Sequence, residues 1–267
     1  MLPIIRSVLA IGMPAALLAV TTSAQATCYS IAGTTPRFIP AAFGNIASVP
    51  RNHVRIDFIG HGSFEIESPA GVRIVTDFNG YLRPSRLPQI VTMNTQSETH
   101  STEFTDPAIK YVLKGWNPAG GVAKHNLRFK DVRVRNVPTN LQNWSGRISN
   151  DSSMFVFDVS DLCIVHLGNL RHVLTRDFVA QLGRVDIALV PIDGTYTMSY
   201  DELFDVLKMI KPALIIPMQF GSAGGAEEFV ARARKLWPVR RHSESWIQLS
   251  FRDLPRQSEV MFLRGGF

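Results

Sequence analysis

The pattern of apolar and polar positions divides the chain near Met154. Before that point the pattern shows short apolar runs separated by turn residues, and the turn at Ser68–Gly71 joins two of these runs into a hairpin. Residues 127–137 alternate charged with apolar side chains, which predicts a single strand with one solvated face. The first half is therefore expected to consist of strands at 54–59, 64–67, 72–76, 90–93 and 127–137.

After Met154 the pattern predicts strands that alternate with helices. Thr175 is a candidate N-cap for a helix at 176–182 that Gly183 ends, and Ser199 is the N-cap of a second helix that runs to Ile210, before Pro212. A third helix is expected at 226–236. Strands are expected at 155–159, 162–165, 187–190 and 214–216, and near Ile247 and Val260. Strands followed by alternating strands and helices predict an α/β sandwich in one domain.

The N-terminus has the pattern of a secretory signal peptide. A positive charge within Met1–Arg6 precedes an apolar run at 8–20, and Ala24-Gln25-Ala26 matches a signal-peptidase site. We expect residues 1–26 to be removed, 27–52 to form an extended lead-in and 53–267 to form the domain. The apolar run is short for a membrane span, so the mature chain is expected in the periplasm or secreted; an uncleaved anchor is the alternative.

Composition argues against a nucleic-acid partner, and export would permit a disulfide. The 267 residues are 45% hydrophobic and 19% charged, with a formal net charge of +6. The basic residues are scattered, and the densest run, 232–241, contains only Trp237 as an aromatic side chain, so we expect no nucleic-acid partner. An exported chain permits a disulfide between Cys28 and Cys163, but the sequence leaves open whether these two residues pair.

Several motifs occur in a fixed order and carry a family resemblance. They are Ile59-Gly-His-Gly-Ser-Phe64, His166-Leu-Gly-Asn169-Leu-Arg-His172, Val185-Asp-Ile-Ala-Leu-Val-Pro191, Tyr196-Thr-Met198, Lys211-Pro212 and Ile216-Pro-Met-Gln219. Together they resemble the metallo-β-lactamase superfamily, in the branch similar to L-ascorbate-6-phosphate lactonase and related zinc-dependent hydrolases. The resemblance covers roughly residues 54–262 and implies the αββα sandwich of that superfamily.

The resemblance also implies where metal ligands would stand, and most of those positions hold other residue types. The family's first loop reads Val-Thr-x-x-His-x-His-x-Asp-His, whereas this chain has Val91-Thr-Met-Asn-Thr-Gln-Ser-Glu-Thr-His100. The expected pocket residues at the seven ligand positions are Thr95, Ser97, Thr99, His100, Asn140, Asn169 and Gln219. Only His100 matches the family, and the other six are neutral and polar, so they are poor zinc donors.

These substitutions favour a protein that no longer hydrolyses its substrate and that binds an unknown small molecule in a polar pocket or has a structural role. On this interpretation no cofactor is expected. His61 and His166 are expected to support loops near the pocket. The alternative is a divergent hydrolase of an ester, lactone or phosphate-like substrate, with zinc held by His100, His166 and a nearby acid such as Glu98 or Glu103. A third alternative is a Ser97–His100 pair oriented by an acid, so the sequence leaves open whether the protein is an enzyme.

Overall fold

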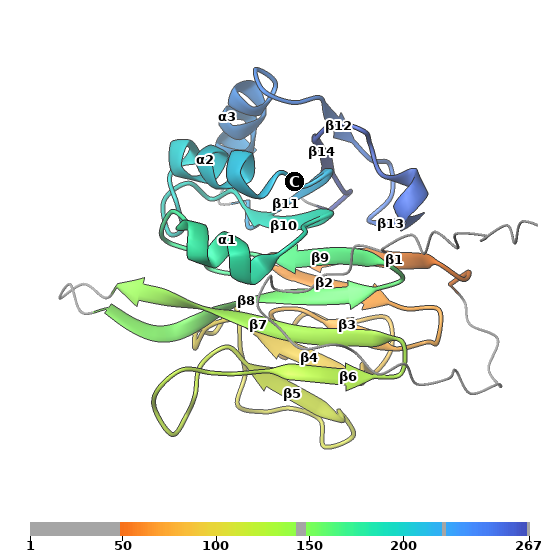
Figure 1. Ribbon diagram of the computed structural model, residues 1–267. Coiled ribbons are helices and arrows are strands. Elements are labelled where there is room, and N and C mark those ends of the chain that lie inside the picture. Colours follow the sequence, from red (N-terminus) through yellow and green to blue (C-terminus); the bar gives the residue numbers. More distant parts are fainter. Residues whose placement is uncertain (1–48, 143–147, 221–222, 266–267) are drawn as a thin grey trace, which may run out of the picture.

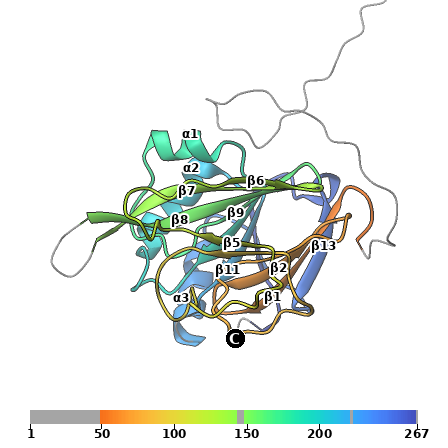
Figure 2. The same cartoon turned by 90° about the horizontal axis from the view of Figure 1, so that it is seen from below.

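Two β-sheets packed face to face form the centre of the molecule, and three helices cover one of them (Figures 1 and 2). The computed structural model describes residues 49–142, 148–220 and 223–265. None of the helices in these ranges is both long and apolar enough to cross a membrane.

The first sheet has six strands in the order β13-β1-β2-β3-β4-β5. Its antiparallel part is a meander closed by β13, while β3, β4 and β5 run parallel to one another. Because the ends of parallel strands meet at one edge, the loops that follow β3, β4 and β5 lie together. The strands are β1 (His53–Gly60), β2 (Ser63–Glu67), β3 (Arg73–Val75), β4 (Ile90–Met93), β5 (Tyr111–Lys114) and β13 (Trp246–Ser250).

The second sheet has eight strands in the order β12-β14-β11-β10-β9-β8-β7-β6. Strands β6 to β9 form an antiparallel meander, and β9, β10, β11, β14 and β12 are parallel. The strands are β6 (Asn126–Phe129), β7 (Val132–Gln142), β8 (Ile148–Val159), β9 (Leu162–His166), β10 (Ile187–Pro191), β11 (Leu214–Met218), β12 (Val239–Arg241) and β14 (Glu259–Phe262).

The helices are α1 (Arg176–Leu182), α2 (Tyr200–Ile210) and α3 (Ala223–Ala233), and a short 3-10 turn, η1 (Phe251–Asp253), follows β13. Helix α2 begins with a reciprocal capping box, in which Ser199 accepts from the Glu202 backbone and the Glu202 carboxylate accepts from the Ser199 backbone. Helix α1 ends at Gly183, whose φ of 70° lies in the left-handed region.

Apolar side chains divide into three clusters that follow these layers. One lies between the sheets, with Phe64 and Ile66 of β2 opposite Phe155 and Phe157 of β8. A second lies between the outer face of the eight-stranded sheet and the helices, where Phe204 and Phe229 pack. The third is small and covers the outer face of the six-stranded sheet. The predicted α/β sandwich is confirmed; in the described residues the helical layer lies over the eight-stranded sheet.

Three local predictions were wrong in detail. Residues 127–137 form two strands, β6 and β7, because Lys130 adopts a left-handed φ of 51° and turns the chain into a hairpin. Helix α3 lies three residues earlier than its pattern predicted, and strands β5 and β12 were not predicted. Thr175 stands at the N-cap of α1, but its side chain makes no capping hydrogen bond.

The predicted signal peptide and residues 27–48 of the predicted lead-in lie outside the described residues, as does Cys28. Cys163 is fully buried in β9 and takes part in a disulfide bond.

Candidate functional site

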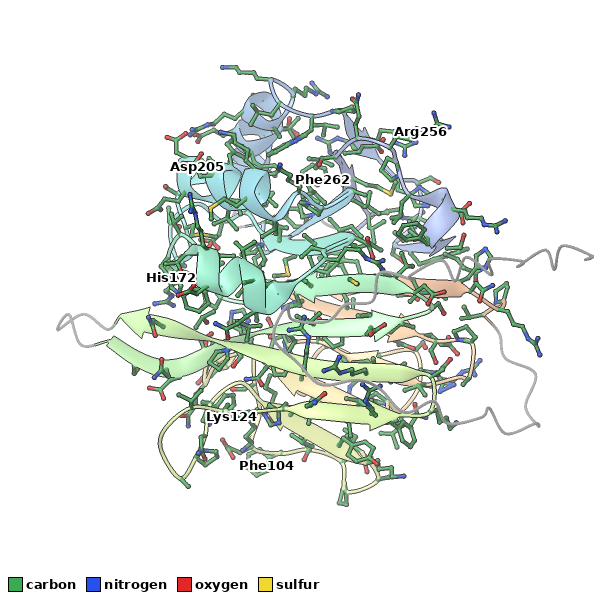
Figure 3. The ribbon with its side chains drawn as sticks, in the orientation of Figure 1. Phe104, Lys124, His172, Asp205, Arg256 and Phe262 are labelled. Carbon is green, nitrogen blue, oxygen red and sulfur yellow. The ribbon has the colours of Figure 1, made fainter. Side chains whose placement is uncertain are left out.

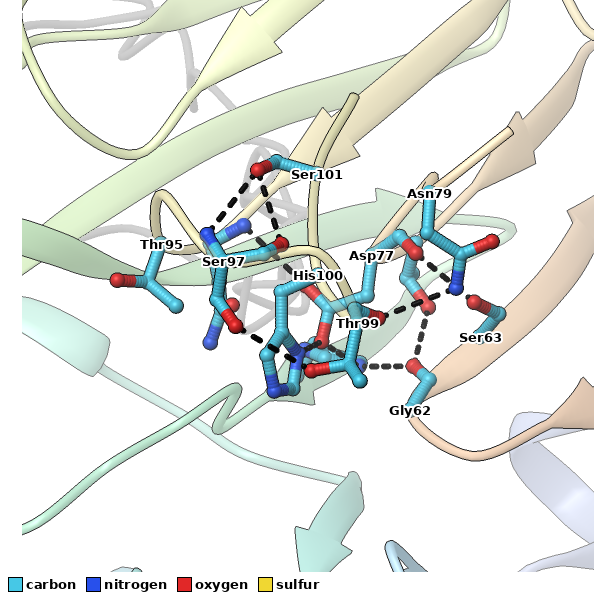
Figure 4. Close-up of polar contacts among 12 residues, drawn as sticks. Gly62, Ser63, Asp77, Asn79, Thr95, Ser97, Thr99, His100 and Ser101 are labelled. Carbon is cyan, nitrogen blue, oxygen red and sulfur yellow. Dashed lines mark hydrogen bonds and ion pairs between the residues drawn. The ribbon is translucent and has the colours of Figure 1, made fainter. Parts of the chain in front are cut away.

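Asp77 is the central residue of a buried polar cluster at the edge where the parallel strands end (Figure 4). It directly follows β3 and Thr76 with a left-handed φ of 44°, and its backbone carbonyl accepts a hydrogen bond of 2.9 Å from the Ser63 hydroxyl. This backbone bend directs the carboxylate, which is 0% exposed, toward the loop after β4. Asp77 was not among the residues predicted from the sequence, although an acidic residue directly after a buried strand is a usable signal.

His100 is hydrogen-bonded to this carboxylate. Its Nδ1 lies 2.7 Å from Asp77 Oδ2, and the Asn94 backbone N–H donates to Asp77 Oδ1 at 3.2 Å. The loop that carries His100 closes on itself, because the backbone N–H groups of His100 and Ser101 both donate to the Ser97 carbonyl. With Nδ1–H donating to Asp77, Nε2 is the nitrogen of His100 that can accept a proton or a hydrogen bond.

Two amide side chains complete the cluster, and two glycines leave room for them. A Cβ atom at Gly62 would lie 2.8 Å from Asp77 Oδ2 and 3.1 Å from Gln219 Nε2. A Cβ atom at Gly168 would lie only 1.8 Å from Asn94 Nδ2. Gln219 Nε2 and both polar atoms of the Asn94 side chain are buried without a hydrogen-bond partner among the described residues.

Two further histidines lie beside the Asp77–His100 pair. His166 Nε2 donates to the Gly62 carbonyl at 2.7 Å and lies 3.9 Å from Asp77 Oδ2. Burial lowers the pKa of His166 despite the nearby carboxylate, which favours a neutral imidazole. The His61 ring centroid is 5.2 Å from that of His100, and the pKa of His61 is lowered by desolvation first and then by repulsion from His100.

The seven expected pocket positions are distributed unevenly around Asp77. His100 and Gln219 belong to the cluster. Thr95 instead donates to the Asp151 carbonyl of β8 at 3.3 Å. Ser97 and Thr99 are exposed, with their hydroxyl oxygens 3.4 Å apart.

The last two expected positions lie on the eight-stranded sheet. Asn140, in β7, donates its backbone N–H to His172 Nε2 at 3.4 Å. Asn169 is buried directly after Gly168, at the end of β9. The structure therefore places Asp77 in contact with His100 and joins the Asn94 backbone to the same carboxylate, whereas Thr95 and Asn140 bond elsewhere.

No group of three or more His, Cys, Asp or Glu side chains in the described ranges is arranged to hold a metal ion. Two cavities, of about 440 and 450 Å³, lie between α2 and α3 and beside β5. Neither is lined by Asp77 or by any of the expected pocket residues.

Two layers of mixed sheet, with polar loops gathered at the ends of the parallel strands, define a metallo-β-lactamase-like fold. Residues 55–219 match the family model of the β-lactamase superfamily domain, so the chain belongs to that superfamily.

Known proteins with similar sequences bear the description metal-dependent hydrolase. A UPF0173 metal-dependent hydrolase of Thermoplasma acidophilum is 33% identical over 106 residues, which cover 40% of this chain and 45% of the relative. One from Pyrococcus horikoshii is 24% identical over 195 residues, covering 63% of this chain and 85% of the relative. The match to the first of these relatives thus spans less than half of its length.

Solved structures show the same fold. A Thermotoga maritima protein described as a Zn-dependent hydrolase of the metallo-β-lactamase superfamily aligns with a TM-score of 0.60 at 24% identity, covering 79% of this chain and 98% of that protein. A metal-dependent hydrolase from Parabacteroides distasonis aligns with a TM-score of 0.53 at 17% identity, covering 67% of this chain and 89% of that protein.

Proposed function

We propose that this chain is an exported member of the superfamily that binds a small polar molecule at the Asp77 cluster without a metal ion and without hydrolysing it. The observation that carries the proposal is the pair of buried amides. Asn94 and Gln219 are 0% and 4% exposed, and their side chains keep polar atoms that no described residue satisfies. An unsatisfied buried polar group costs about 1–3 kcal/mol, so a polar molecule that hydrogen-bonds to these atoms would be stabilised there.

The unpaired atoms also define the chemistry of that molecule. Asn94 presents both a free carbonyl oxygen and a free amide nitrogen, and Gln219 presents a free amide nitrogen. A ligand that carries a hydrogen-bond donor next to an acceptor, such as a hydroxylated lactone or a polyol, matches this arrangement. The substrate class of the superfamily resemblance, esters and lactones, contains such molecules.

The donor atoms do not fit zinc. Structural and catalytic zinc sites take at least three protein ligands from Cys, His, Asp or Glu. Here His166 Nε2 donates to the Gly62 carbonyl, and both carboxylate oxygens of Asp77 already accept hydrogen bonds, from Asn94 and His100. In the described ranges His100 Nε2 has no set of two further His, Cys, Asp or Glu donors arranged around it, and neutral amides are weak zinc donors.

A second function is favoured by one specific contact. The 2.7 Å hydrogen bond from His100 Nδ1 to Asp77 orients the imidazole and leaves Nε2 as the nitrogen that can accept a proton, the arrangement of a general base. Such a pair would deprotonate a water molecule or a nearby hydroxyl for attack on an ester or lactone. This candidate is a divergent hydrolase that works from His100, and it requires no rewired zinc site.

Metal content and hydrolysis separate these functions. We expect protein purified without chelators to contain well under one equivalent of zinc, and to show no turnover of 4-nitrophenyl acetate or glucono-1,5-lactone above that of the His100→Ala variant. About one equivalent of zinc, lost in His100→Ala, would contradict the proposal. Turnover without metal that His100→Ala abolishes would instead establish the general-base hydrolase.

Binding is tested with glucono-1,5-lactone and with glucitol, an uncharged open-chain polyol of the same carbon number. We expect one of them to raise the melting temperature of the wild-type protein in a concentration-dependent manner, and the Asn94→Leu variant to lose that shift. Gln248→Leu, an exposed amide on β13, is the matched control and should keep the shift.

Export belongs to the same proposal. It is supported by the charged, apolar and small-residue sequence of residues 1–26. We expect the mature protein to begin at Thr27, which mass spectrometry of the exported chain measures directly.

A further inference from the structure

A second cavity lies at the end of the molecule formed by β5 and the loop that leads to β6. We propose that this cavity binds a small organic anion with an apolar body, such as an aromatic carboxylate. Its volume is about 450 Å³, within the range of about 300–1,000 Å³ that is typical of small-molecule sites. The proposal does not rest on the function proposed for the Asp77 cluster.

Part of the cavity lining is apolar. Val112 of β5, Trp116 of the following loop and Val122 contribute to it. Trp116 belongs to the small apolar cluster of the six-stranded sheet, which fixes its ring, while Val122 is 40% exposed. A bound ring would remove this apolar surface from water, the usual source of affinity in such a site.

The rim of the cavity is basic. Lys114 Nζ lies 5.5 Å from the Trp116 ring centroid and 3.3 Å from a carboxylate oxygen of Glu103, a side chain that is 64% exposed. Lys124, labelled in Figure 3, also lines the cavity. It forms no ion pair with any residue that the structure describes. A ligand carboxylate beside Lys124 would therefore gain an attraction that no described residue uses.

Hydrogen bonds hold the loop around the cavity in place. His125 Nε2 donates to the Lys114 carbonyl at 2.7 Å, and the Ser153 hydroxyl donates to the Gly115 carbonyl at 2.7 Å. The Asn136 side chain donates to the Ala123 carbonyl at 2.9 Å. Because these contacts fix both ends of the loop, little conformational entropy remains to be lost on binding.

The cavity is distinct from the Asp77 cluster but adjoins the loop that carries it. The Gly115 backbone N–H donates to the Met93 carbonyl, and a Cβ atom at Gly115 would lie 2.2 Å from the Asn94 carbonyl oxygen. The two sites therefore share a backbone contact without sharing a lining residue.

Titration calorimetry with naphthalene-2-carboxylate tests this site. We expect the wild-type protein to bind one equivalent, and to bind the neutral naphthalene-2-carboxamide about tenfold more weakly, because only the carboxylate is attracted to the lysines. Lys124→Glu should weaken binding of the carboxylate about tenfold or more, and Val122→Asp should also weaken it. Both substitutions are at surface positions, so folding, checked by circular dichroism, should be unchanged.

Lys208→Glu is the matched control, because Lys208 lines the other cavity, between α2 and α3. This variant should bind like the wild-type protein. Absence of saturable binding would overturn the proposal, as would equal affinity for the carboxamide or unchanged binding in both Lys124→Glu and Val122→Asp. None of these outcomes depends on the zinc, hydrolysis or glucitol measurements at the Asp77 cluster.

Discussion

The six-stranded and eight-stranded sheets both supply residues to the Asp77 cluster, but they supply different chemistry. The loops of the six-stranded sheet contribute an ionisable pair, Asp77 and His100, whose members bond to each other. In the eight-stranded sheet, β9 ends with His166, which donates to a backbone carbonyl, and β11 is followed by the amide Gln219. One half pairs its own charged groups, whereas the other contributes a neutral amide and a histidine whose lowered pKa favours the neutral imidazole, so the two sheets differ in the charge that they bring to the cluster.

The largest expected effect is a gain of zinc binding when residue types that serve as ligands in the family are introduced into the loops of both sheets. The triple variant Ser97→His, Asn169→Asp, Gln219→His should bind about one equivalent of zinc, because it adds three strong donors near His100. Elemental analysis after dialysis against zinc measures the change.

Adding His100→Ala to the triple variant is the control and should remove most of that zinc. If the triple variant folds but takes up no more zinc than the wild-type protein, the two halves do not face one metal position. The difference between the sheets would then have no bearing on metal binding.

Loss of the charged partner should be the next largest effect. Asp77→Ala leaves His100 and the Asn94 N–H without their acceptor in a buried site, so we expect a loss of about 3–5 kcal/mol in the free energy of unfolding, measured by urea denaturation. Asp205→Ala, which removes an exposed pair with Lys208, should cost at most about 1 kcal/mol. Equal losses in the two variants would show that the Asp77–His100 pair does not support the cluster.

The neutral state of His166 predicts a smaller effect that depends on pH. Burial lowers its pKa below the ordinary value of 6.5, so the unfolded chain takes up a proton at a higher pH than the folded chain. The contribution of the neutral His166 to the free energy of unfolding is therefore fully present above about pH 6.5. It is lost as the pH falls toward the pKa of the folded state, by at most about 1.4 kcal/mol per pH unit.

His166→Gln keeps a donor for the Gly62 carbonyl and cannot titrate, so its urea midpoint should change less between pH 7 and pH 5. A pH dependence identical to that of the wild-type protein would place the titration elsewhere, for example at His61, whose pKa is also lowered.

The smallest effect is expected at Thr95, which lies at a family ligand position but bonds to β8. Thr95→Val removes one hydrogen bond of 3.3 Å to the Asp151 carbonyl and should cost about 1 kcal/mol. Urea denaturation measures the loss. Zinc content and the thermal shift with glucono-1,5-lactone should not change, and a change in either would mean that Thr95 faces the site.

Local patterns predicted most of the fold because the elements with strong signals are also the buried ones. Leu214–Ile216 is a continuous apolar run and Ile90–Met93 is apolar apart from Thr92, and both are inner strands with every residue buried. Ser199 and Glu202 form the capping box that fixes the start of α2. By contrast, Val239–Arg241 is a strand because it pairs with β14. The three residues themselves show no strand pattern that would predict this pairing.

The site was less accessible to sequence reasoning because its contacts join distant segments. Comparison with family ligand positions found His100 and Gln219 but not Asp77, since that comparison began at the loop after β4. Thr95 occupies a ligand position in the sequence, yet a β-bridge to Ser152 turns it toward the other sheet. The orphaned amide of Asn94 depends on the position of Gly168, 74 residues later, which no local pattern reports.

The contact between Gly168 and Asn94 also limits which substitutions this protein can accumulate during evolution. Because any side chain at position 168 would overlap the Asn94 amide, most substitutions there become tolerable only after Asn94 has been replaced by a smaller residue. A smaller residue at position 94, in turn, leaves a void under a glycine that stays left-handed, with a φ of 60°. The two positions are therefore expected to show strong epistasis, with the double variant Asn94→Gly, Gly168→Asn fitter than at least one of its single intermediates.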